Sequence, residues 1–390
     1  MKAYKDYSFI KGVNYEYENK NEDDWRRELE MGKRIGLNSV RIWLKYYLYT
    51  QNPKEYIAML KNFFRVCGES GYSVIVILFN ANDIHAEDPF YLEEPFKKEG
   101  EGYLKCVVNA IRKEPALLMY DMMNEPGGNH LIWDANDDGE REYWFKKHWN
   151  FVRYFSALVK TIDPITPTTV GCSNSMQINE TAECVDVLSY HCYAKTRAQI
   201  IHYAEIALEA SKDYAKPVLC TETGCVARGN PYDVVIEVLS GYKIPWYVYG
   251  LTADGYWADS QGIFYRDGTV RDPAIVAAIM GFYRNRDYNT IVPENPNREH
   301  FVSECLNRLS RLFDDNAVDV FNYHNLSADA LLEVCEELAN YLEGAQLVSM
   351  RVPPTARINQ WRNQKNPNLL EIKDFAYEMA EIVRRACHIR

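Results

Sequence analysis

The sequence predicts an α/β protein, a (β/α)8 TIM barrel with a small C-terminal α/β extension. Eight short, strand-like stretches alternate with mostly helical ones, which is typical of a parallel sheet. The chain has 390 residues, and a closed barrel of this kind needs about 250 residues. The glycine-rich phosphate loops GxGxxG and GxxxxGKS/T, which accompany many open α/β sheets, are both missing.

The expected strands are mostly near-continuous apolar runs, as suits strands that are buried on both faces. They are expected at residues 8–14, 38–44, 73–80, 117–124, 168–172, 185–193, 216–222 and 244–249. An open doubly wound sheet more often has about five or six strands. The number of strand units therefore favours closure into a barrel.

Helices are expected between these strands, because apolar side chains recur there at helical spacing. Their expected ranges are 23–34, 53–70, 101–113, 143–158, 197–214, 232–240 and 274–284. Residues 81–100 and 127–139 are rich in charged and polar residues, and we expect them to form loops. The second of these follows the fourth strand directly, and structureless loops of this length are usually functional.

A linker at residues 290–297, rich in proline and asparagine, marks the expected domain boundary. We expect the catalytic barrel at residues 1–288 and a mostly helical extension of unknown role at residues 289–390. The extension is expected to contain helices at 298–313, 328–342 and 368–388 and strands at 318–321 and 347–352. No catalytic motif is evident in this part of the sequence.

Composition argues against several kinds of partner. The formal net charge of −11 and the pI of about 5.4 disfavour binding to nucleic acid and to anionic membranes. No apolar run is long enough to cross a membrane, and the first residues lack the apolar core of a signal peptide. The cysteines are scattered without a CxxC pair, and several lie in apolar runs. We therefore expect buried, reduced cysteines and a cytoplasmic location, with secretion from a trimmed sequence left open.

Two glutamates follow buried strands, and they are the candidate catalytic residues. The fourth apolar run ends in Asn124, Glu125 and Pro126, and proline stops strand pairing because it has no N–H to donate. The seventh run ends in Glu222 in the same way, before a turn at Gly224. Active sites of barrels lie at the carboxyl ends of the strands, where both glutamates are expected.

A pair of carboxyl groups in this position suits retaining glycoside hydrolysis. That reaction needs two carboxyl groups about 5–5.5 Å apart, one as acid/base and one as nucleophile. The nucleophile must stay ionised, which calls for a nearby cation and hydrogen-bond donors, whereas the acid must hold a proton near neutral pH. Arg41, at the end of the second strand, is the candidate cation, and Tyr193, at the end of the sixth, is the candidate donor.

Four short motifs occur in the order and at the strand ends that are typical of one enzyme family. They are Val40-Arg41-Ile42, Asn124-Glu125-Pro126, His191-Cys192-Tyr193 and Thr221-Glu222-Thr223-Gly224. Over residues 8–285 the chain resembles the clan A retaining glycoside hydrolases, and it is most similar to glycoside hydrolase family 5, the cellulase- and mannanase-like enzymes. The resemblance implies a retaining β-glycosidase of carbohydrate metabolism that uses neither a cofactor nor a metal ion.

The resemblance also implies a role for each residue of these motifs. Glu125 would be the general acid/base, and Glu222 would be the nucleophile. Four residues would serve them: Asn124 would bind the 2-hydroxyl of the sugar, Arg41 would keep Glu222 ionised, Tyr193 would donate a hydrogen bond to Glu222, and His191 would tune the protonation of Glu125.

Two positions depart from the family pattern, and they bear on the sugar more than on the reaction. The family usually has a histidine near the end of the third strand, where this chain has Asn80, with His85 five residues on. The family usually ends the eighth strand in a tryptophan beneath the sugar, where this chain has Tyr249. Trp246 and Trp257 are the other candidates for this platform.

The sequence also leaves rival functions open. A metal-dependent barrel enzyme could use Asp121, Glu125 and Glu222 as ligands, although alternation along the strand would place Asp121 deeper than Glu125. A non-catalytic carbohydrate-binding barrel is compatible with the missing histidine, and a transglycosidase would use the same residues as a hydrolase. The expected partner is a β-linked oligo- or polysaccharide. The sugar, the linkage, exo or endo action and the oligomeric state are left open.

Overall fold

The computed structural model describes residues 4–84, 90–225, 227–253, 261–282, 328–344, 354–369, 371–372, 375–376 and 378–379. The chain divides into two compact units, Met1–Tyr283 and Arg284–Arg390. The expected domain boundary at residue 288 lies outside the described residues. Within the described residues, no helix is both long and apolar enough to cross a membrane.

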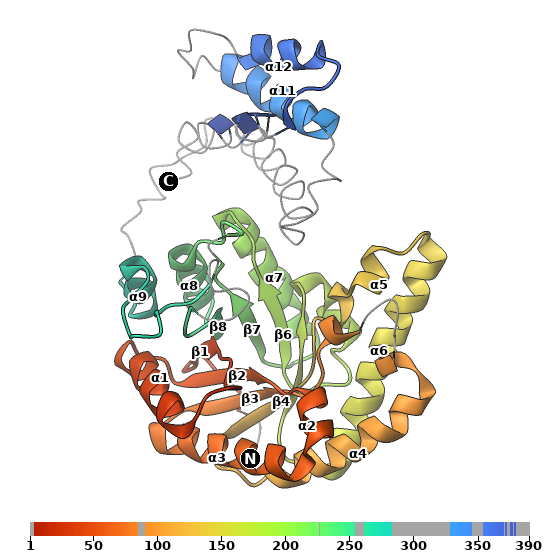
Figure 1. Ribbon diagram of the computed structural model, residues 1–390, viewed down its shortest axis with the longest axis vertical. Helices are drawn as coiled ribbons and strands as arrows, with labels where there is room; N and C mark the ends of the chain where they lie inside the picture. Colours follow the sequence, from red (N-terminus) through yellow and green to blue (C-terminus); the bar gives the residue numbers. More distant parts are fainter. Residues whose placement is uncertain are drawn as a thin grey trace. The chain divides into compact units, whose positions relative to one another are not determined.

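The strands of the first unit form a closed parallel barrel, which confirms the predicted fold class (Figure 1). They pair in chain order from β1 to β8, and β8 pairs with β1 to close the barrel. Their bounds are β1 Lys11–Asn14, β2 Ser39–Trp43, β3 Ser73–Ile77, β4 Leu117–Asn124, β5 Thr168–Cys172, β6 Leu188–Cys192, β7 Val218–Thr223 and β8 Trp246–Tyr249. Each expected strand is present, and most are shorter than the apolar run that predicted them.

The connections between the strands are largely helical (Figure 1). The helices are α1 Glu22–Arg34, α2 Tyr46–Gln51, α3 Pro53–Ser70, α4 Glu94–Ile111, α5 His130–Trp133, α6 Asp138–Ile162, α7 Arg197–Asp213, α8 Tyr232–Gly241 and α9 Pro273–Ile279. Short 3-10 turns lie at η1 Ala81–Asp83, η2 Phe90–Leu92, η3 Pro126–Gly128 and η4 Ser175–Glu180. The sequence did not predict α2 or α5, and it placed the start of α4 too late.

Local signals explain where the helices before the site-bearing strands begin and end. Asn21 and Thr196 cap α1 and α7 through reciprocal capping boxes with Asp24 and Gln199. Gly71 ends α3 in the left-handed conformation (φ 81°, ψ 23°), which glycine adopts without strain. The strands that follow these helices are β2, β7 and β3, and all three carry candidate site residues at or just beyond their ends.

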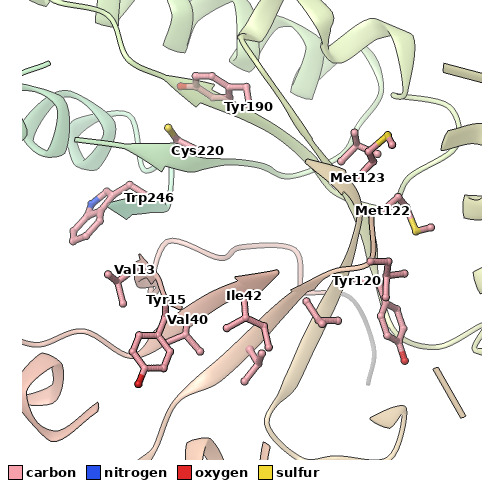
Figure 2. Packing of buried hydrophobic residues seen from close by; sticks show 14 of the residues in the cluster. Val13, Tyr15, Val40, Ile42, Tyr120, Met122, Met123, Tyr190, Cys220 and Trp246 are labelled. Carbon is pink, nitrogen blue, oxygen red and sulfur yellow. The ribbon is translucent and has the colours of Figure 1, made fainter. Parts of the chain in front are cut away.

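Side chains alternate along each strand between the barrel interior and the surrounding helices. On β2, Val40 and Ile42 belong to the main hydrophobic cluster, which packs the strands against the helices. Figure 2 shows part of this cluster, including Val40, Ile42 and Trp246. Arg41 and Trp43 have the opposite parity and therefore point into the barrel.

A separate hydrophobic cluster fills the barrel interior at the amino ends of the strands. It consists of Tyr7, Ile10, Ile75, Leu118, Met119, Val187, Leu219 and Tyr247. The ring of Tyr247 lies over Gly12, where an added Cβ would be only 2.2 Å from ring carbon Cδ1. Ser39 Oγ lies 2.7 Å from the hydroxyl of the same tyrosine. The interior is therefore solid at this end, and the polar interior side chains lie at the other.

An irregularity in the sheet aligns two candidate site residues. The register between β6 and β7 shifts between Tyr190 and His191, so that Tyr190 pairs with Cys220 whereas His191 pairs with Glu222. A shift of this kind re-aims the side chains beyond it. His191 and Glu222 consequently face the same space, with Nδ1 and Oε2 3.4 Å apart.

The described part of the second unit is helical. Helix α11 Ala328–Gly344 confirms the helix expected at 328–342, and α12 Pro354–Arg362 was not expected. Arg362 Nη2 in α12 pairs with Glu336 Oε2 in α11 at 2.6 Å, and Trp361 is buried. The elements expected at 298–313, 318–321 and 347–352, and most of the helix expected at 368–388, lie outside the described residues.

The cysteines in the described part of the chain are free thiols. Most are buried, as expected, although Cys106 is exposed and Cys184 is half-buried. Burial raises the pKa of Cys67 and Cys220 well above its ordinary value, so these thiols stay protonated and unreactive.

Candidate active site

Glu125 directly follows the carboxyl end of β4 in an uncommon backbone conformation. Its φ of 48° and ψ of 52° lie in the left-handed region, which residues other than glycine rarely adopt. Its N–H donates to the carbonyl oxygen of Gly171 on β5 at 2.8 Å, and Pro126 then ends strand pairing. The side chain is held at the mouth of the barrel, where 22% of it is exposed.

Glu222, on β7, faces Glu125 across the mouth of the barrel. One carboxylate oxygen of each glutamate and one ring nitrogen of His191 all lie within 4.8 Å of one another. The side chain of Glu222 is only 6% exposed, so the two carboxylates lie in different environments. A molecule that contacts both of them must sit between the ends of β4 and β7.

Arg41, on β2, is a fully buried cation that connects these strands. Its Nη1 donates to Glu222 Oε1 at 2.6 Å, and its Nε and Nη2 donate to Asp121 Oδ2 at 2.9 and 2.8 Å. Nη1 also donates to Asn14 Oδ1 at 3.1 Å, and Nη2 to Asn124 Oδ1 at 2.9 Å. Burial by itself lowers the pKa of Arg41, but the carboxylates of Asp121 and Glu222 raise that pKa above its ordinary value. Arg41 is therefore a permanent positive charge beside Glu222.

Asp121 binds Arg41 in the barrel interior and does not reach the mouth of the site. It is fully buried on β4, and its Oδ1 accepts the N–H of Gly171 at 3.0 Å. Gly171 leaves room for this arrangement, because a Cβ there would lie 2.5 Å from Arg41 Nη2 and 2.8 Å from His191 Nε2. With both oxygens engaged in the interior, Asp121 does not fit the role of a metal ligand alongside the two glutamates.

Tyr193, the residue after β6, gives Glu222 a second donor. Its hydroxyl donates to Glu222 Oε2 at 2.9 Å. Burial and the charge of Glu222 raise the pKa of Tyr193 well above its ordinary value, so the hydroxyl keeps its proton. The guanidinium of Arg228 covers the tyrosine ring, 4.7 Å from its centroid. Glu222 thus accepts one charged and one neutral hydrogen bond, an environment that suits a carboxylate.

His191, on β6, contacts both glutamates but lies closer to Glu125. Its Nδ1 is 2.6 Å from Glu125 Oε1, and its Nε2 is buried without a hydrogen-bond partner in the described part of the chain. Burial acts to raise the pKa of Glu125, but the hydrogen bond and charge of His191, followed by the charges of Arg228 and Arg41, leave that pKa below its ordinary value. The contact with His191 is therefore the main cause that favours the ionised form of Glu125.

Asn124, the last residue of β4, is fixed from both sides. Its Oδ1 accepts from Arg41, and its Nδ2 donates to Asn80 Oδ1 at 3.3 Å. Asn80 also caps the 3-10 turn η1 and donates to Asp83 Oδ1 at 3.0 Å. The structure thus places Asn80 at the edge of the site, where it orients Asn124.

The end of β8 places Tyr249 beside Trp43 of β2. The two ring centroids are 5.5 Å apart, and Trp43 also packs against Arg41, whose Cζ is 5.2 Å from the indole centroid. Trp246 instead belongs to the outer hydrophobic cluster, where its Nε1 donates to Ser240 Oγ at 3.2 Å. The interpretation of Trp246 as a sugar platform is therefore wrong, because its side chain points away from the barrel interior.

Two residues near the centre of the site were missed in the sequence. Trp43 lies two positions beyond Arg41, so strand alternation could have identified it as an interior residue. Asn14 ends the strand expected at residues 8–14, but nothing in its sequence context shows that it binds Arg41. Trp257 and His85, which the sequence offered as candidates, lie outside the described residues.

The fold and the paired carboxylates together define a class, the glycoside hydrolases built on a TIM barrel. The family model described as "Cellulase (glycosyl hydrolase family 5)" matches residues 5–255, well over half of the chain. The chain belongs to glycosyl hydrolase family 5, which confirms the resemblance seen in the strand-end motifs. No curated protein matches the chain.

Solved structures of glycoside hydrolases share the fold at low sequence identity. An endo-1,4-beta-mannanase from Rhizomucor miehei is 14% identical, with a TM-score of 0.55 over 70% of this chain and 93% of that chain. GH5_18 from Streptomyces cattleya, in complex with GlcNAc, is 16% identical, with a TM-score of 0.52 over 70% of this chain and 78% of that chain. Beta-glucuronidase 2 from Bacteroides uniformis is 13% identical, with a TM-score of 0.51 over 71% of this chain and 35% of that chain. At these identities the likeness is one of fold.

Proposed function

We propose that this family 5 enzyme is a retaining β-glycosidase with Glu222 as the nucleophile and Glu125 as the general acid/base. The observation that carries the proposal is the spacing of the two side chains, which have carboxylate oxygens within 4.8 Å of each other. Retaining enzymes hold their carboxyl groups about 5–5.5 Å apart, whereas inverting enzymes separate them by about 6.5–9.5 Å to admit a water molecule. The spacing in this chain favours direct attack by Glu222 on the sugar.

The surroundings of Glu222 suit a nucleophile. Arg41 holds one of its oxygens and Tyr193 holds the other, so the carboxylate is both oriented and matched in charge. In the first step, a Glu222 oxygen bonds to the anomeric carbon while the bond from that carbon to the leaving oxygen breaks. The leaving oxygen takes up a proton through Glu125, and the product is a glycosyl ester of Glu222.

His191 tunes the protonation of Glu125 in this proposal. In the first step Glu125 must carry a proton, whereas its 2.6 Å contact with His191 Nδ1 lowers its pKa and favours the carboxylate. In the second step, Glu125 must be a carboxylate to take a proton from the attacking water. The lowered pKa of Glu125 directly suits this second step.

Asn124 is positioned to bind the hydroxyl next to the reacting carbon. Its amide is fixed by Arg41 and Asn80 between the two glutamates, and a hydrogen bond to the sugar 2-hydroxyl contributes most in the transition state of retaining enzymes. Tyr249 and Trp43 would offer aromatic faces to the sugar ring. The mannanase and GlcNAc-bound neighbours support a β-linked oligo- or polysaccharide as the substrate.

The anomer that is released first tests the mechanism. Proton NMR during hydrolysis of an aryl β-glycoside should show the β-anomer before mutarotation mixes the products. Glu222→Gln and Glu125→Ala should each lower turnover by several orders of magnitude. Glu30→Gln is the control, because Glu30 is exposed on α1. First release of the α-anomer, or near wild-type turnover by either active-site variant, would reject the proposal.

A metal-dependent hydrolase is the second candidate, because Glu125, His191 and Glu222 have the spacing of metal ligands. Arg41 opposes a divalent ion there, since its guanidinium already lies 2.6 Å from Glu222 Oε1 and carries the same sign of charge. Dialysis against EDTA is expected to leave turnover unchanged. Loss of turnover that a divalent ion restores would favour the metal enzyme, and sugar binding without turnover would favour a non-catalytic barrel.

A further inference from the structure

Helix α5, which follows Glu125 in the connection after β4, ends in an exposed tryptophan. Trp133 has an exposed fraction of 62%, and it alone is exposed among the tryptophans that the structure describes. A single exposed aromatic side chain is common on protein surfaces and by itself needs no functional explanation. A role for Trp133 requires that it is held in place and lies beside the site, and both conditions are met.

The segment between Glu125 and Trp133 is fixed at several points. The N–H of Gly128 donates to the carbonyl oxygen of Glu125 at 2.9 Å, so the turn η3 folds back on the glutamate. Asn129 is fully buried, and its Nδ2 donates to the carbonyl oxygen of Ala81 in η1 at 2.6 Å. Helix α5 packs against η3 and against α6 (Figure 1). A ligand that stacks on Trp133 would therefore lose little affinity to the ordering of the protein.

The carbonyl oxygen of Gly127 joins Trp133 to the connection after β5. Trp133 Nε1 and Gln177 Nε2, from η4, both donate to this oxygen at 3.4 Å. Only glycine permits the approach, because a Cβ at Gly127 would lie 2.5 Å from Gln177 Nε2. Trp133 and Gln177 thus form a pair two residues beyond Glu125. An indole face can stack on a sugar ring, and the second N–H of the amide can bind a sugar hydroxyl.

The position of the pair identifies which sugar it can reach. A Cβ at Gly128 would lie 3.4 Å from Glu125 Cβ and 2.8 Å from Ser173 Oγ, so the connections after β4 and β5 meet beside Glu125. In the proposed mechanism, Glu222 on β7 bonds to the retained sugar, and Glu125 gives a proton to the oxygen of the departing one. The departing sugar therefore lies on the Glu125 side, where these two connections carry the pair.

We propose that Trp133 and Gln177 form the subsite for the departing sugar, the aglycone. The indole stacks on the apolar face of that sugar ring, and the amide of Gln177 binds one of its hydroxyl groups. The inference rests on the proposed function, because it takes Glu125 as the acid that protonates the leaving oxygen. The enzyme is thereby expected to favour substrates from which a sugar departs over substrates with a small leaving group.

The test compares two substrates that share the retained sugar and differ in the group that departs. An aryl glycoside panel identifies the sugar, and its β-fluoride then has a leaving group without a ring, whereas the best-hydrolysed of its β-linked disaccharides has a leaving sugar. Trp133→Ala should lower kcat/KM for the disaccharide about 10- to 100-fold and leave kcat/KM for the fluoride unchanged. Trp133→Phe keeps an aromatic face and should lose less than the alanine variant. The control Tyr242→Ala removes a partly exposed ring that precedes β8, at the amino ends of the strands, and should change neither value.

The comparison separates a subsite from a structural role of Trp133, because disturbance of Glu125 or Glu222 would slow both substrates. Equal losses of kcat/KM for the fluoride and the disaccharide in Trp133→Ala would overturn the inference. Unchanged kcat/KM for the disaccharide in that variant would overturn it too, as would a wild type that hydrolyses the fluoride but no disaccharide. A wild type that hydrolyses neither aryl glycosides nor fluorides would instead reject the proposed function, and this inference with it.

Discussion

Arg41 Nη1 lies 2.6 Å from Glu222 Oε1, and Arg41 is fully buried while the glutamate side chain is only 6% exposed. The same guanidinium binds Asp121, so one cation balances two carboxylates in the barrel interior. Removal of one partner from a buried ion pair leaves an uncompensated charge and costs about 3–5 kcal/mol. The site and the stability of the barrel therefore depend on the same side chain.

Arg41→Met should lower the free energy of unfolding by about 3–5 kcal/mol and abolish measurable turnover. Arg41→Lys keeps the charge but cannot reproduce the forked contacts to Asp121 and Asn124, so it should be more stable than the methionine variant and still lose about 100-fold in kcat. Urea unfolding and aryl glycoside kinetics measure the two effects. The exposed Arg34 provides the control Arg34→Met. A methionine variant at position 41 that is as stable as the wild type would contradict the argument.

Gly171→Ala should damage the site without changing any polar group. The added methyl would lie 2.5 Å from Arg41 Nη2 and 2.8 Å from His191 Nε2, so both side chains must shift. Crowding of this kind costs about 1–3 kcal/mol, and the misplaced arginine and histidine should lower kcat. Gly241→Ala is the matched control, because an added Cβ there meets no atom within 4 Å. Similar behaviour of the two variants in thermal unfolding and kinetics would show that the interior is not tightly packed at Gly171.

His191→Leu should move the alkaline limb of the pH–rate profile to higher pH. In the proposed mechanism the first step needs a proton on Glu125, so kcat/KM should fall as the pH rises through the pKa of that group. His191 lowers this pKa, and burial, the opposing cause, remains after the substitution. The pKa of Glu125 should therefore rise, and activity should persist to higher pH even if its maximum is reduced. His130→Gln changes an exposed imidazole and should leave the limb in place, whereas a shift of the limb to lower pH in the leucine variant would refute the role given to His191.

Glu18→Gln should stabilise the protein at alkaline pH. Glu18 follows β1, its Oε1 is buried without a partner among the described residues, and burial is the main cause that raises its pKa from 4.5 to about 7. Below about pH 4.5, Glu18 is protonated in both the folded and the unfolded protein, so it does not change the free energy of unfolding. Above about pH 7, its ionisation lowers the free energy of unfolding by about 3 kcal/mol.

Urea unfolding at about pH 5 and about pH 8.5 measures the effect of Glu18→Gln. The glutamine variant should gain stability over the wild type at the higher pH and little at the lower pH, because the penalty is removed only where Glu18 is ionised. Glu30→Gln controls for the loss of one negative charge from the surface. A glutamine variant with the same pH dependence as the wild type would show that another group is responsible.

The strands were predictable because burial on both faces leaves a near-continuous apolar run in the sequence. The helical residues that were not predicted include residue types with modest or low helix propensity. Residues 46–51 of α2 include three tyrosines and a threonine, which have modest helix propensity. The start of α4 precedes Gly100, which weakens the helical pattern, yet a Cβ there would lie 2.8 Å from the ring of Phe155. The reason for this glycine is a tertiary contact that local sequence does not contain.

The candidate site was predictable to the extent that it follows strand ends and strand parity. Strand parity could also have excluded Trp246 as a sugar platform, because Trp246 is an odd number of positions from Tyr249 and so faces the other side of β8. The pairing of His191 with Glu222 could not be predicted, because it depends on a register shift between two strands. The ion pair between Asp121 on β4 and Arg41 on β2 could not be predicted either, because it needs the space that Gly171 leaves on β5.

In the described part of the chain, the packed cluster around Tyr7 and Tyr247 closes the barrel at the amino ends of its strands. A sugar that reaches Glu222 cannot pass through the floor, so departing and arriving molecules must share the opening above the carboxyl ends of the strands. In the proposed mechanism an ester forms on Glu222, and the departing group then has to clear that opening before water or a second sugar can approach. Competition between water and a second sugar for this shared opening, rather than the carboxylates themselves, would then decide whether the ester is hydrolysed or its sugar is transferred to another carbohydrate.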